Sequence, residues 1–334
     1  MKIAIFDLKD WEKPLFRTAL RAHSLAFYTE PFQEVNPKKL KDAEAVTVFI
    51  TSKLDKKALD AMPKLKLIAT RSTGYDHIDL AEAARRGIAV VNVPTYGENT
   101  VAEHTFGLIL TLSRNIHEAY LRTIKNNFSI EGLKGFDLHG KTIGVVGAGK
   151  IGSHVIRIAR GFGMNVLAYD PYPNELLAET LDFKYVNLKT LLKSSDVITL
   201  HVPLIPATKH IICGKNLALI KKGALLINTA RGGLIETQCL IKGLQSGRLS
   251  GVGLDVLEEE QLLMEEKHML RRGGKNEKEL KSIVKDHKLL KMDNVIFTPH
   301  IAFYSQEAVE RITHTTIDNI VAFTRGKLSN IVKQ

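Results

Sequence analysis

Residues 142–152 read TIGVVGAGKIG, and this stretch decides the fold. The apolar run TIGVV is followed by the pattern G-x-G-x-x-G and then by the helical run SHVIRIARGFG, which indicates a strand, a glycine-rich turn and a helix. In such a unit Gly147 makes the tight turn, Gly149 lets the backbone approach a pyrophosphate, and Gly152 permits close packing of the helix. The start of the helix supplies free N–H groups and a partial positive charge. The stretch therefore predicts a dinucleotide-binding unit.

The next predicted strand, NVLAYD, ends in Asp170, near the spacing at which an acid binds the ribose 2′-hydroxyl of a dinucleotide. A carboxylate at this position would repel a 2′-phosphate, so the sequence predicts NAD rather than NADP. The alternative is a glycine-rich turn that binds no ligand. The strand, the loop, the helix and the acid occur together, and this combination favours NAD binding over a turn without a ligand.

Outward from this unit, short apolar runs alternate with longer amphipathic stretches along the chain, which is typical of parallel sheets covered by helices. A long helical stretch is predicted from near Val101. The predicted strands before it are KIAIF, AVTVFIT, LKLIATR and AVVNV, and those after it are KTIGVVG, NVLAYD, VITLHVP, ALLINTA, GVGLDV and NVIFTPH. We expect an α/β fold with two Rossmann-like, doubly wound parallel sheets, the first flavodoxin-like.

Composition excludes several classes of protein. With 334 residues, 44% of them hydrophobic, the chain can bury the cores of two domains. The first apolar run, MKIAIFDL, is too short to span a membrane and lacks a signal-peptide cleavage pattern, so we expect a soluble, cytoplasmic protein. Cys213 and Cys239 lack metal or redox spacing, and HEAYL lacks the second histidine of a zinc motif, so no metal is expected.

The net charge of +11 raises the possibility of nucleic-acid binding. The most basic stretch, EEKHMLRRGGKNEKELKSIVKDHKLLK, interleaves acids with bases, which is typical of a solvated helix face. We therefore expect no nucleic-acid partner, and we interpret the charged insertion over residues 261–292 as a surface excursion. A basic protein also suits anionic substrates.

Ligands of open α/β sheets lie at the carboxyl ends of the strands, so the residues that follow the strands are the candidate site residues. They are Ser72, Thr73, Gly74, Tyr96, Val202, Pro203, Ala230, Arg231, Asp255, Glu260 and His300. A guanidinium, a carboxylate and an imidazole are thus expected beside a dinucleotide.

These motifs resemble the D-2-hydroxyacid dehydrogenase family, and within it the D-lactate dehydrogenases. The resemblance covers essentially the whole chain, through RSTGYDHIDL, NVPTYGENTVAEHTFGLIL, GVVGAGKIG, HVPLIPAT, INTARGGLIET, GLDVLEEE and TPHIAFYS. It implies a substrate-binding domain built from residues 1–99 and 301–334, an NAD-binding Rossmann domain over residues 100–300, a cleft between them, and a homodimer.

The resemblance also implies the catalytic residues. Arg231 would bind the carboxylate and carbonyl of the substrate, His300 would be the acid/base, and Glu260 would be the partner of His300. Hydride transfer to a ketone needs a proton donor, and a neighbouring carboxylate keeps an imidazole protonated near neutral pH. An arginine fork matches an α-keto acid. Glu258, Glu259 and Glu260 are adjacent, so the residues alone leave the choice among them open, and the family spacing selects Glu260.

Further roles are implied in the same way. The backbone amides of Ser72, Thr73 and Gly74 would hold the substrate carboxylate, and Tyr96, Phe303 and Tyr304 would shape the pocket. Implied cofactor contacts are Lys150 and Ile151 to the pyrophosphate, Asp170 to the ribose, Val202, Pro203 and Thr208 to the adenosine side, and Thr229, Ala230 and Asp255 near the nicotinamide. His77, His104, His201 and His210 are expected to be structural.

The expected reaction is the reduction of pyruvate, or a near relative, to the D-2-hydroxy acid. The alternatives are a related enzyme that acts on hydroxypyruvate, glyoxylate or phosphoglycerate, and a non-enzymatic NAD-sensing protein similar to corepressors of this fold. The aromatic pair after His300 favours a small aliphatic keto acid over a phosphorylated one.

Overall fold

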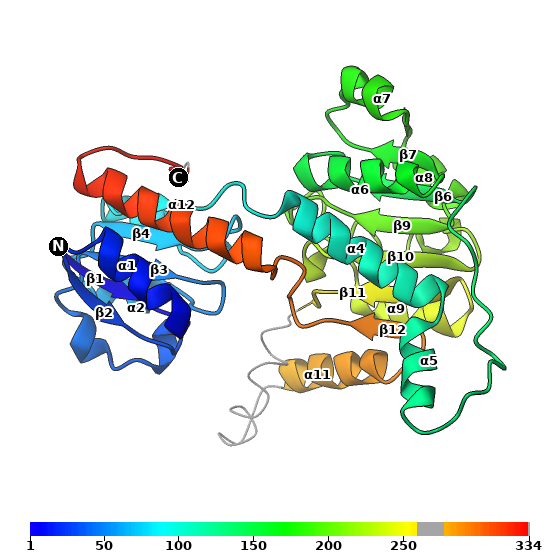
Figure 1. The fold of residues 1–334 in the computed structure, drawn as a ribbon, viewed down its shortest axis with the longest axis horizontal. Coiled ribbons are helices and arrows are strands. Elements are labelled where there is room, and N and C mark those ends of the chain that lie inside the picture. Colours follow the sequence, from blue (N-terminus) through cyan, green and yellow to red (C-terminus); the bar gives the residue numbers. More distant parts are fainter. Residues whose placement is uncertain (259–276, 333–334) are drawn as a thin grey trace. The chain divides into compact units, whose positions relative to one another are not determined.

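The computed structural model describes residues 1–258 and 277–332 of the chain. The chain divides into two compact units (Figure 1). Unit 1 consists of Met1–Gly97 and Ser305–Gln334, and unit 2 consists of Glu98–Tyr304. Each unit has its own parallel sheet, so the predicted fold class is confirmed.

The sheet of unit 1 has the strand order β2-β1-β3-β4-β5, and all of its neighbouring strands are parallel. This is the order of a flavodoxin-like sheet. Its strands are β1 (Lys2–Ile5), β2 (Ser24–Phe27), β3 (Ala45–Val48), β4 (Leu67–Thr70) and β5 (Ala89–Val91). The segments that follow β1, β3, β4 and β5 therefore meet at one edge of this sheet.

Helices cover both faces of the sheet in unit 1 (Figure 1). Phe16 from α1 and Ile317 and Ile320 from α12 pack on one face, whereas Leu59 from α2 and Ala83 from α3 pack on the other. The helices are α1 (Lys13–Ala19), α2 (Lys56–Asp60), α3 (Leu80–Arg85) and α12 (Gln306–Thr324), with the 3-10 turns η1 (Asp10–Glu12), η2 (Phe32–Glu34) and η3 (Pro37–Leu40). Because α12 comes from the carboxyl end of the chain, unit 1 is built from both chain ends.

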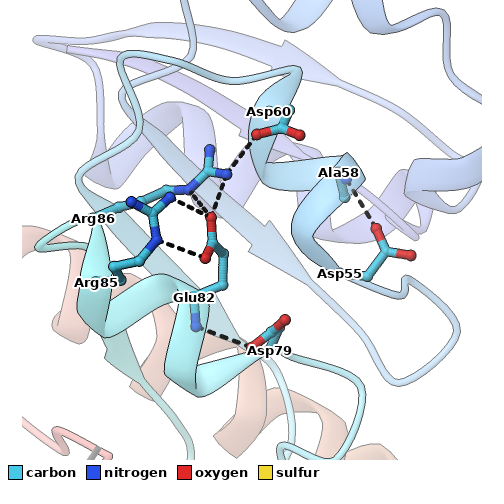
Figure 2. A network of polar contacts seen from close by, with 7 residues as sticks. All are labelled: Asp55, Ala58, Asp60, Asp79, Glu82, Arg85 and Arg86. Carbon is cyan, nitrogen blue, oxygen red and sulfur yellow. Dashed lines mark hydrogen bonds and ion pairs between the residues drawn. The ribbon is translucent and has the colours of Figure 1, made fainter.

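A polar network joins α2 to α3 (Figure 2). Glu82 accepts hydrogen bonds from Arg85 and Arg86, and Arg86 also donates to Asp60 at 2.5 Å. Asp79 caps α3 by accepting from the Glu82 amide at 3.0 Å. The network connects the end of α3 to the end of α2 at the surface of unit 1.

The sheet of unit 2 has the order β12-β11-β10-β9-β6-β7-β8, and all its pairs are parallel. This is the Rossmann order with one additional strand at the edge, and it reverses between β6 and β9. The strands are β6 (Thr142–Val146), β7 (Asn165–Tyr169), β8 (Lys184–Tyr185), β9 (Val197–Leu200), β10 (Ala224–Asn228), β11 (Leu249–Leu254) and β12 (Val295–Phe297).

Two hydrophobic cores lie on the two faces of this sheet. Helices α4 and α6 pack on one face through residues such as Phe106 and Ile156, and α8 and α9 pack on the other through Leu191 and Leu240. The helices of unit 2 are α4 (Glu98–Ser113), α5 (Ile116–Thr123), α6 (Lys150–Gly161), α7 (Glu175–Leu181), α8 (Leu188–Ser194), α9 (Thr237–Gln245) and α11 (Glu277–Leu290), with the 3-10 turns η4 (Leu217–Leu219) and η5 (Gly232–Leu234).

The long helical stretch predicted from near Val101 starts three residues earlier and is divided in two. Helix α4 runs from Glu98 to Ser113, and α5 begins at Ile116. Asn115 between them has a φ of 52°, a left-handed conformation that asparagine adopts more readily than most residues. No helix in the described part of the chain is long and apolar enough to cross a membrane.

Candidate functional site

The phosphate loop after β6 needs glycine at two positions for packing within the protein. Gly147 has a φ of 97°, and a Cβ there would lie 2.6 Å from the carbonyl oxygen of His201. A Cβ on Gly152 would lie 1.9 Å from the carbonyl oxygen of Gly147. A Cβ on Gly149, in contrast, would meet no atom of the described residues within 4 Å. The open space beside Gly149 therefore fits the close approach of a ligand to this loop.

Helix α6 begins at Lys150 directly after the loop, and its N-cap residue, Gly149, has no side chain that could cap the amino end. The Lys150 ammonium lies 3.9 Å from Oε1 of Glu98. Asp170 follows β7, and its carboxylate accepts hydrogen bonds from the amides of Ala148 and Tyr172, both at 2.9 Å. These bonds hold the acid against the loop, and an ionised carboxylate retains further lone pairs for hydroxyl groups. The amino end of α6 and the Lys150 ammonium can donate hydrogen bonds, and the Asp170 carboxylate can accept them. These groups fit a dinucleotide with free ribose hydroxyls.

The segment after β9 contains Val202, Pro203 and Thr208, which were predicted to lie along the adenosine. The Thr208 hydroxyl donates to the Pro203 carbonyl at 2.5 Å and accepts from the Ile205 amide at 2.9 Å, so it shapes its own turn. Burial lowers the pKa of His201 to about 3, and Nε2 of His201 lies 2.8 Å from the Thr199 hydroxyl. His201 is therefore a neutral imidazole at physiological pH.

Thr229, Ala230 and Arg231 follow β10. The Asn228 side chain accepts from the Ala230 amide at 3.0 Å and donates to the Arg231 carbonyl at 2.8 Å. Nη1 of Arg231 donates to the Ala230 carbonyl at 2.8 Å, and the hydroxyl of Thr229 lies 3.0 Å from that of Thr105 on α4. Asn228 thus fixes the backbone of the turn that carries the predicted arginine.

Asp255 follows β11 and organises the turn that carries His300. Its side chain is 1% exposed, and it accepts from the Thr298 hydroxyl at 2.5 Å and from the amides of Ile301 at 2.9 Å and Ala302 at 2.8 Å. The His300 amide donates to the carbonyls of Asp255 and Thr298, both at 2.9 Å, and its φ is 55°. A buried carboxylate thus holds the histidine turn in a conformation that non-glycine residues rarely adopt.

Arg231, Asp255 and His300 lie at the ends of three neighbouring strands, because β11 pairs with both β10 and β12. The structure therefore brings these three predicted residues to one edge of the sheet. His104 on α4 joins them, since its Nε2 lies 3.0 Å from the Thr298 hydroxyl and 3.6 Å from Oδ1 of Asp255.

The aromatic pair Phe303 and Tyr304 follows the histidine turn. The ring of Phe303 stands edge-on to that of His300, with centroids 6.5 Å apart, and edge-on to that of Tyr304, with centroids 5.7 Å apart. Tyr304 is 57% exposed. The predicted pocket aromatics of unit 2 thus lie beside the histidine.

Of the glutamates after Asp255, Glu260 lies outside the described residues. Glu258 binds Nε2 of His210 at 2.6 Å and the amide and hydroxyl of Thr237 at 3.2 and 3.1 Å. Burial favours the protonated form of Glu258, but the His210 and Thr237 hydrogen bonds outweigh it and lower the pKa of this carboxyl below its ordinary value. This pair, which the sequence did not predict, joins the segments that follow β9 and β11.

The residues predicted to bind the substrate from the first part of the chain lie in unit 1. Ser72, Thr73 and Gly74 follow β4, and we call residues 72–74 the substrate loop, after the role predicted for them from the sequence. Among the described residues, no protein group accepts a hydrogen bond from the amide of Thr73 or Gly74. Tyr96 lies further along the chain, where its carbonyl accepts from Nε of Arg311 at 2.5 Å. Two donors of the substrate loop are thus left for a ligand.

Within the part of the chain that the structure describes, no group of three or more histidine, cysteine or acidic side chains is arranged to hold a metal ion. Cys213 and Cys239 are both free thiols, and burial raises the pKa of Cys239 to about 12. Neither thiol belongs to the groups that surround His300.

Comparison with known proteins gives the family. The profile of the D-isomer specific 2-hydroxyacid dehydrogenase NAD-binding domain matches residues 106–302. The chain is 37% identical to D-lactate dehydrogenase of Escherichia coli, over 98% of each chain, and 40% identical to a 2-hydroxyacid dehydrogenase homolog of Haemophilus influenzae, over 99% of each. Among solved structures, D-lactate dehydrogenase of Aquifex aeolicus, complexed with NAD and lactic acid, superposes with a TM-score of 0.88 at 40% identity, covering 99% of this chain and 98% of the other.

The phosphate loop, the acid after β7 and the full-length similarity agree on one family. The chain belongs to the D-isomer specific 2-hydroxyacid dehydrogenases, NAD-dependent oxidoreductases that act on small 2-hydroxy acids.

Proposed function

We propose that the protein is a D-lactate dehydrogenase that reduces pyruvate with NADH to D-lactate, with His300 as the acid/base and Arg231 as the substrate ligand. The observation that carries the proposal is the turn of His300, which the buried Asp255 carboxylate holds two strands away from Arg231. The similarity to D-lactate dehydrogenases over the full chain supports the choice of substrate.

The chemistry assigned to each residue follows from its charge. NADH, when bound, supplies the hydride. The Arg231 guanidinium carries a fixed positive charge in a planar fork, so it orients the carboxylate and the carbonyl oxygen of the keto acid. An N–H of the His300 imidazole gives its proton to that oxygen as negative charge develops there. We assign Glu260 as the carboxylate that keeps His300 protonated.

The binding residues are proposed on the same basis. In unit 1 the substrate loop would hold the substrate carboxylate, which the two amides without a described partner support, and Tyr96 would contact the substrate. In unit 2 Phe303 and Tyr304 would limit substrate size. The proposed cofactor residues are Gly147, Gly149, Lys150, Ile151, Gly152, Asp170, Val202, Pro203, Thr208, Thr229, Ala230, Arg231 and Asp255.

A panel of keto acids and a histidine variant test this function. The panel contains pyruvate, hydroxypyruvate, glyoxylate and phosphohydroxypyruvate, and NADH absorbance is followed with each. We expect the highest kcat/KM with pyruvate and D-lactate as the product. We expect His300→Ala to lower kcat by about 10² to 10⁴, the range for a lost general acid, with the NADH dissociation constant unchanged. His314→Ala, at an exposed position on α12, is the control.

The proton balance gives a second readout. Because reduction consumes a proton, the equilibrium should favour D-lactate at low pH and pyruvate at high pH. A higher kcat/KM with another acid of the panel would overturn the substrate, and wild-type turnover in His300→Ala would overturn the role of the histidine.

We further propose that the protein is a homodimer, as predicted from the family resemblance. Exposed apolar side chains line one stripe of α5 and continue into the segment after it, and we call them the α5 patch. They are Ile116, Tyr120, Leu121, Ile124, Phe128 and Ile130. Soluble monomers rarely expose such a group of large apolar side chains, so a second copy of the chain is the proposed occupant. The cytoplasmic location stays a prediction.

A further inference from the structure

A buried ion pair lies in unit 1 directly before the substrate loop. Nη1 of Arg71 donates to Oε1 of Glu12 at 2.7 Å, and the two side chains are 5% and 3% exposed. Arg71 is the first residue after β4, and Glu12 ends the 3-10 turn η1. A guanidinium and a carboxylate from distant parts of the sequence thus meet inside the unit.

The guanidinium also binds the backbone at the end of β1. Nη2 of Arg71 donates to the carbonyl of Phe6 at 2.6 Å and to that of Asp7 at 2.7 Å. The Arg71 amide donates to the Val48 carbonyl at the end of β3 at 2.8 Å. Arg71 therefore connects the carboxyl ends of three strands of this sheet.

Glu12 is held from two further directions. Its Oε2 accepts from the Lys9 amide at 2.8 Å, and its Oε1 accepts from the Thr313 hydroxyl at 3.1 Å. Thr313 lies on α12, so the carboxylate also connects the amino-terminal part of unit 1 to its carboxyl-terminal helix. The position of the Arg71 side chain is thus fixed, directly or through Glu12, by three segments: the end of β1, η1 and α12.

Stability alone does not account for this arrangement. Moving two charges out of water costs several kcal/mol for each ion, and apolar side chains of similar volume often give an equal or higher stability. What an apolar pair cannot supply is the set of directed hydrogen bonds to Phe6, Asp7 and Glu12. The ion pair therefore determines where the backbone leaves β4.

The substrate loop begins at the next residue, and its own bonds leave it little freedom. The Ser72 hydroxyl donates to the Gly74 carbonyl at 2.6 Å, and the Thr73 hydroxyl donates to the Val93 carbonyl at 2.7 Å. The Asn92 side chain donates to the Thr73 carbonyl at 2.8 Å, and the Val93 amide donates to the Ser72 carbonyl at 3.1 Å. These bonds involve the hydroxyls of Ser72 and Thr73 and the carbonyls of residues 72–74. The amides of Thr73 and Gly74 therefore remain available to bind a ligand.

We propose that Arg71, with Glu12 as its counter-ion, is a positioning residue of the substrate loop. The proposal rests on the proposed function, in which this loop binds the carboxylate of the keto acid. Arg71 does not touch the substrate. It fixes the start of the loop against the ends of β1 and β3, so that the Thr73 and Gly74 amides stay available to the substrate carboxylate.

This role predicts an effect on KM rather than on kcat. The carboxylate of the substrate does not react, so its hydrogen bonds are similar in the bound substrate and in the transition state. Losing an interaction of this kind raises KM and leaves kcat unchanged. A residue that supports only the stability of unit 1 would change neither constant in the folded enzyme.

The test replaces the ion pair by an apolar pair in the full-length enzyme, Glu12→Leu with Arg71→Met. Each tenfold change in KM corresponds to about 1.4 kcal/mol, and one charge-assisted hydrogen bond contributes about 1.5–3 kcal/mol, so KM for pyruvate should rise by about tenfold or more. We expect kcat and the NADH dissociation constant to stay close to the wild-type values. The melting temperature should fall, because the carbonyls of Phe6 and Asp7 lose their donor. Arg71→Lys should raise KM as well, because an ammonium lacks the planar fork.

The matched control makes the same exchange in the surface network of unit 1, Glu82→Leu with Arg86→Met, and should leave KM unchanged (Figure 2). Hydrogen exchange of the peptide over residues 71–78 provides a readout that does not depend on turnover. Exchange in this peptide should be faster in the Glu12–Arg71 double variant and unchanged in the control.

Wild-type KM and wild-type exchange in a folded double variant would overturn the positioning role. If the wild-type enzyme reduces no keto acid, the proposed function fails, and the exchange experiment alone decides whether Arg71 orders the loop. If the double variant does not fold, Thr313→Val removes only the bond to Glu12, and wild-type KM and exchange in that variant would equally overturn the role.

Discussion

Gly149 differs from Gly147 and Gly152 of the phosphate loop, because packing within the described part of the protein does not require glycine at this position. A methyl group at this position would meet no protein atom within 4 Å, and the backbone conformation is open to any residue. We therefore expect Gly149→Ala to fold with a stability within about 1 kcal/mol of the wild type, since alanine restricts the unfolded chain but is a poorer N-cap of α6 than glycine. Its NADH dissociation constant should rise by about tenfold or more, which corresponds to about 1.4 kcal/mol.

Titration of NADH fluorescence measures the binding, and thermal unfolding measures the stability. Gly161→Ala at the other end of α6 is the matched control, because a Cβ there also meets no protein atom within 4 Å. It should keep the wild-type affinity. Equal NADH affinities in the two variants would show that the pyrophosphate does not lie against Gly149.

At the scale of residues, local patterns could be predicted and distant pairs could not. The strand, glycine-rich turn and helix of the loop, and the position of Asp170 directly after the next strand, could be predicted because they depend on residues close in sequence. The hydrogen bonds of Asp255 to the turn of His300 and the bond of Glu258 to His210 join residues 46 and 48 positions apart. Such contacts follow from the order of the strands in the sheet, which the sequence alone does not specify.

At the scale of elements, the network between α2 and α3 predicts a pH-dependent contribution to the stability of unit 1. The hydrogen bonds of Glu82 to Arg85 and Arg86 lower its pKa to about 2, below the ordinary value of 4.5 (Figure 2). A carboxylate with a lowered pKa stabilises the folded state above the unfolded pKa and loses this effect as the pH falls towards the folded pKa. Glu82→Gln should therefore unfold at lower urea concentration than the wild type above pH 4.5, and the difference should shrink as the pH falls towards 2.

Urea unfolding followed by circular dichroism at several pH values checks this expectation. Because the network is at the surface, added salt should reduce the difference between the two proteins at neutral pH. A difference that is independent of pH would mean that the loss of the Glu82 charge is not its cause.

The sequence predicted the central strands more completely than the edges of the sheets. Strands β9 and β10 are buried throughout and appear as continuous apolar runs. The edge strand β2 alternates exposed and half-buried residues over SLAF, and β8 contains only Lys184–Tyr185, so neither was predicted. The division between α4 and α5 was also missed, because it depends on one left-handed residue, Asn115, within an otherwise helical pattern.

At the scale of the whole molecule, each unit buries its own cores on both faces of its sheet, yet the α5 patch stays exposed. The exposed residues Ile116 and Tyr120 of α5 and Ile124 at its C-cap are spaced four positions apart, so they lie on one side of the helix. Burial of a large apolar side chain contributes about 1.5–3 kcal/mol, so several of them can stabilise an association. The α5 patch is therefore where we expect the second copy to bind.

Ile124→Glu combined with Phe128→Glu tests this expectation, because it places two charges where apolar side chains are 58% and 76% exposed. One chain has a mass of 37.2 kDa. By light scattering, the wild type should have twice this mass, and the double variant should have the mass of one chain. Leu176→Glu on α7, where leucine is 73% exposed, is the control and should remain dimeric. Since an unpaired charge in an apolar interface costs more than the lost burial alone, a double variant that still has the wild-type mass would place the interface elsewhere.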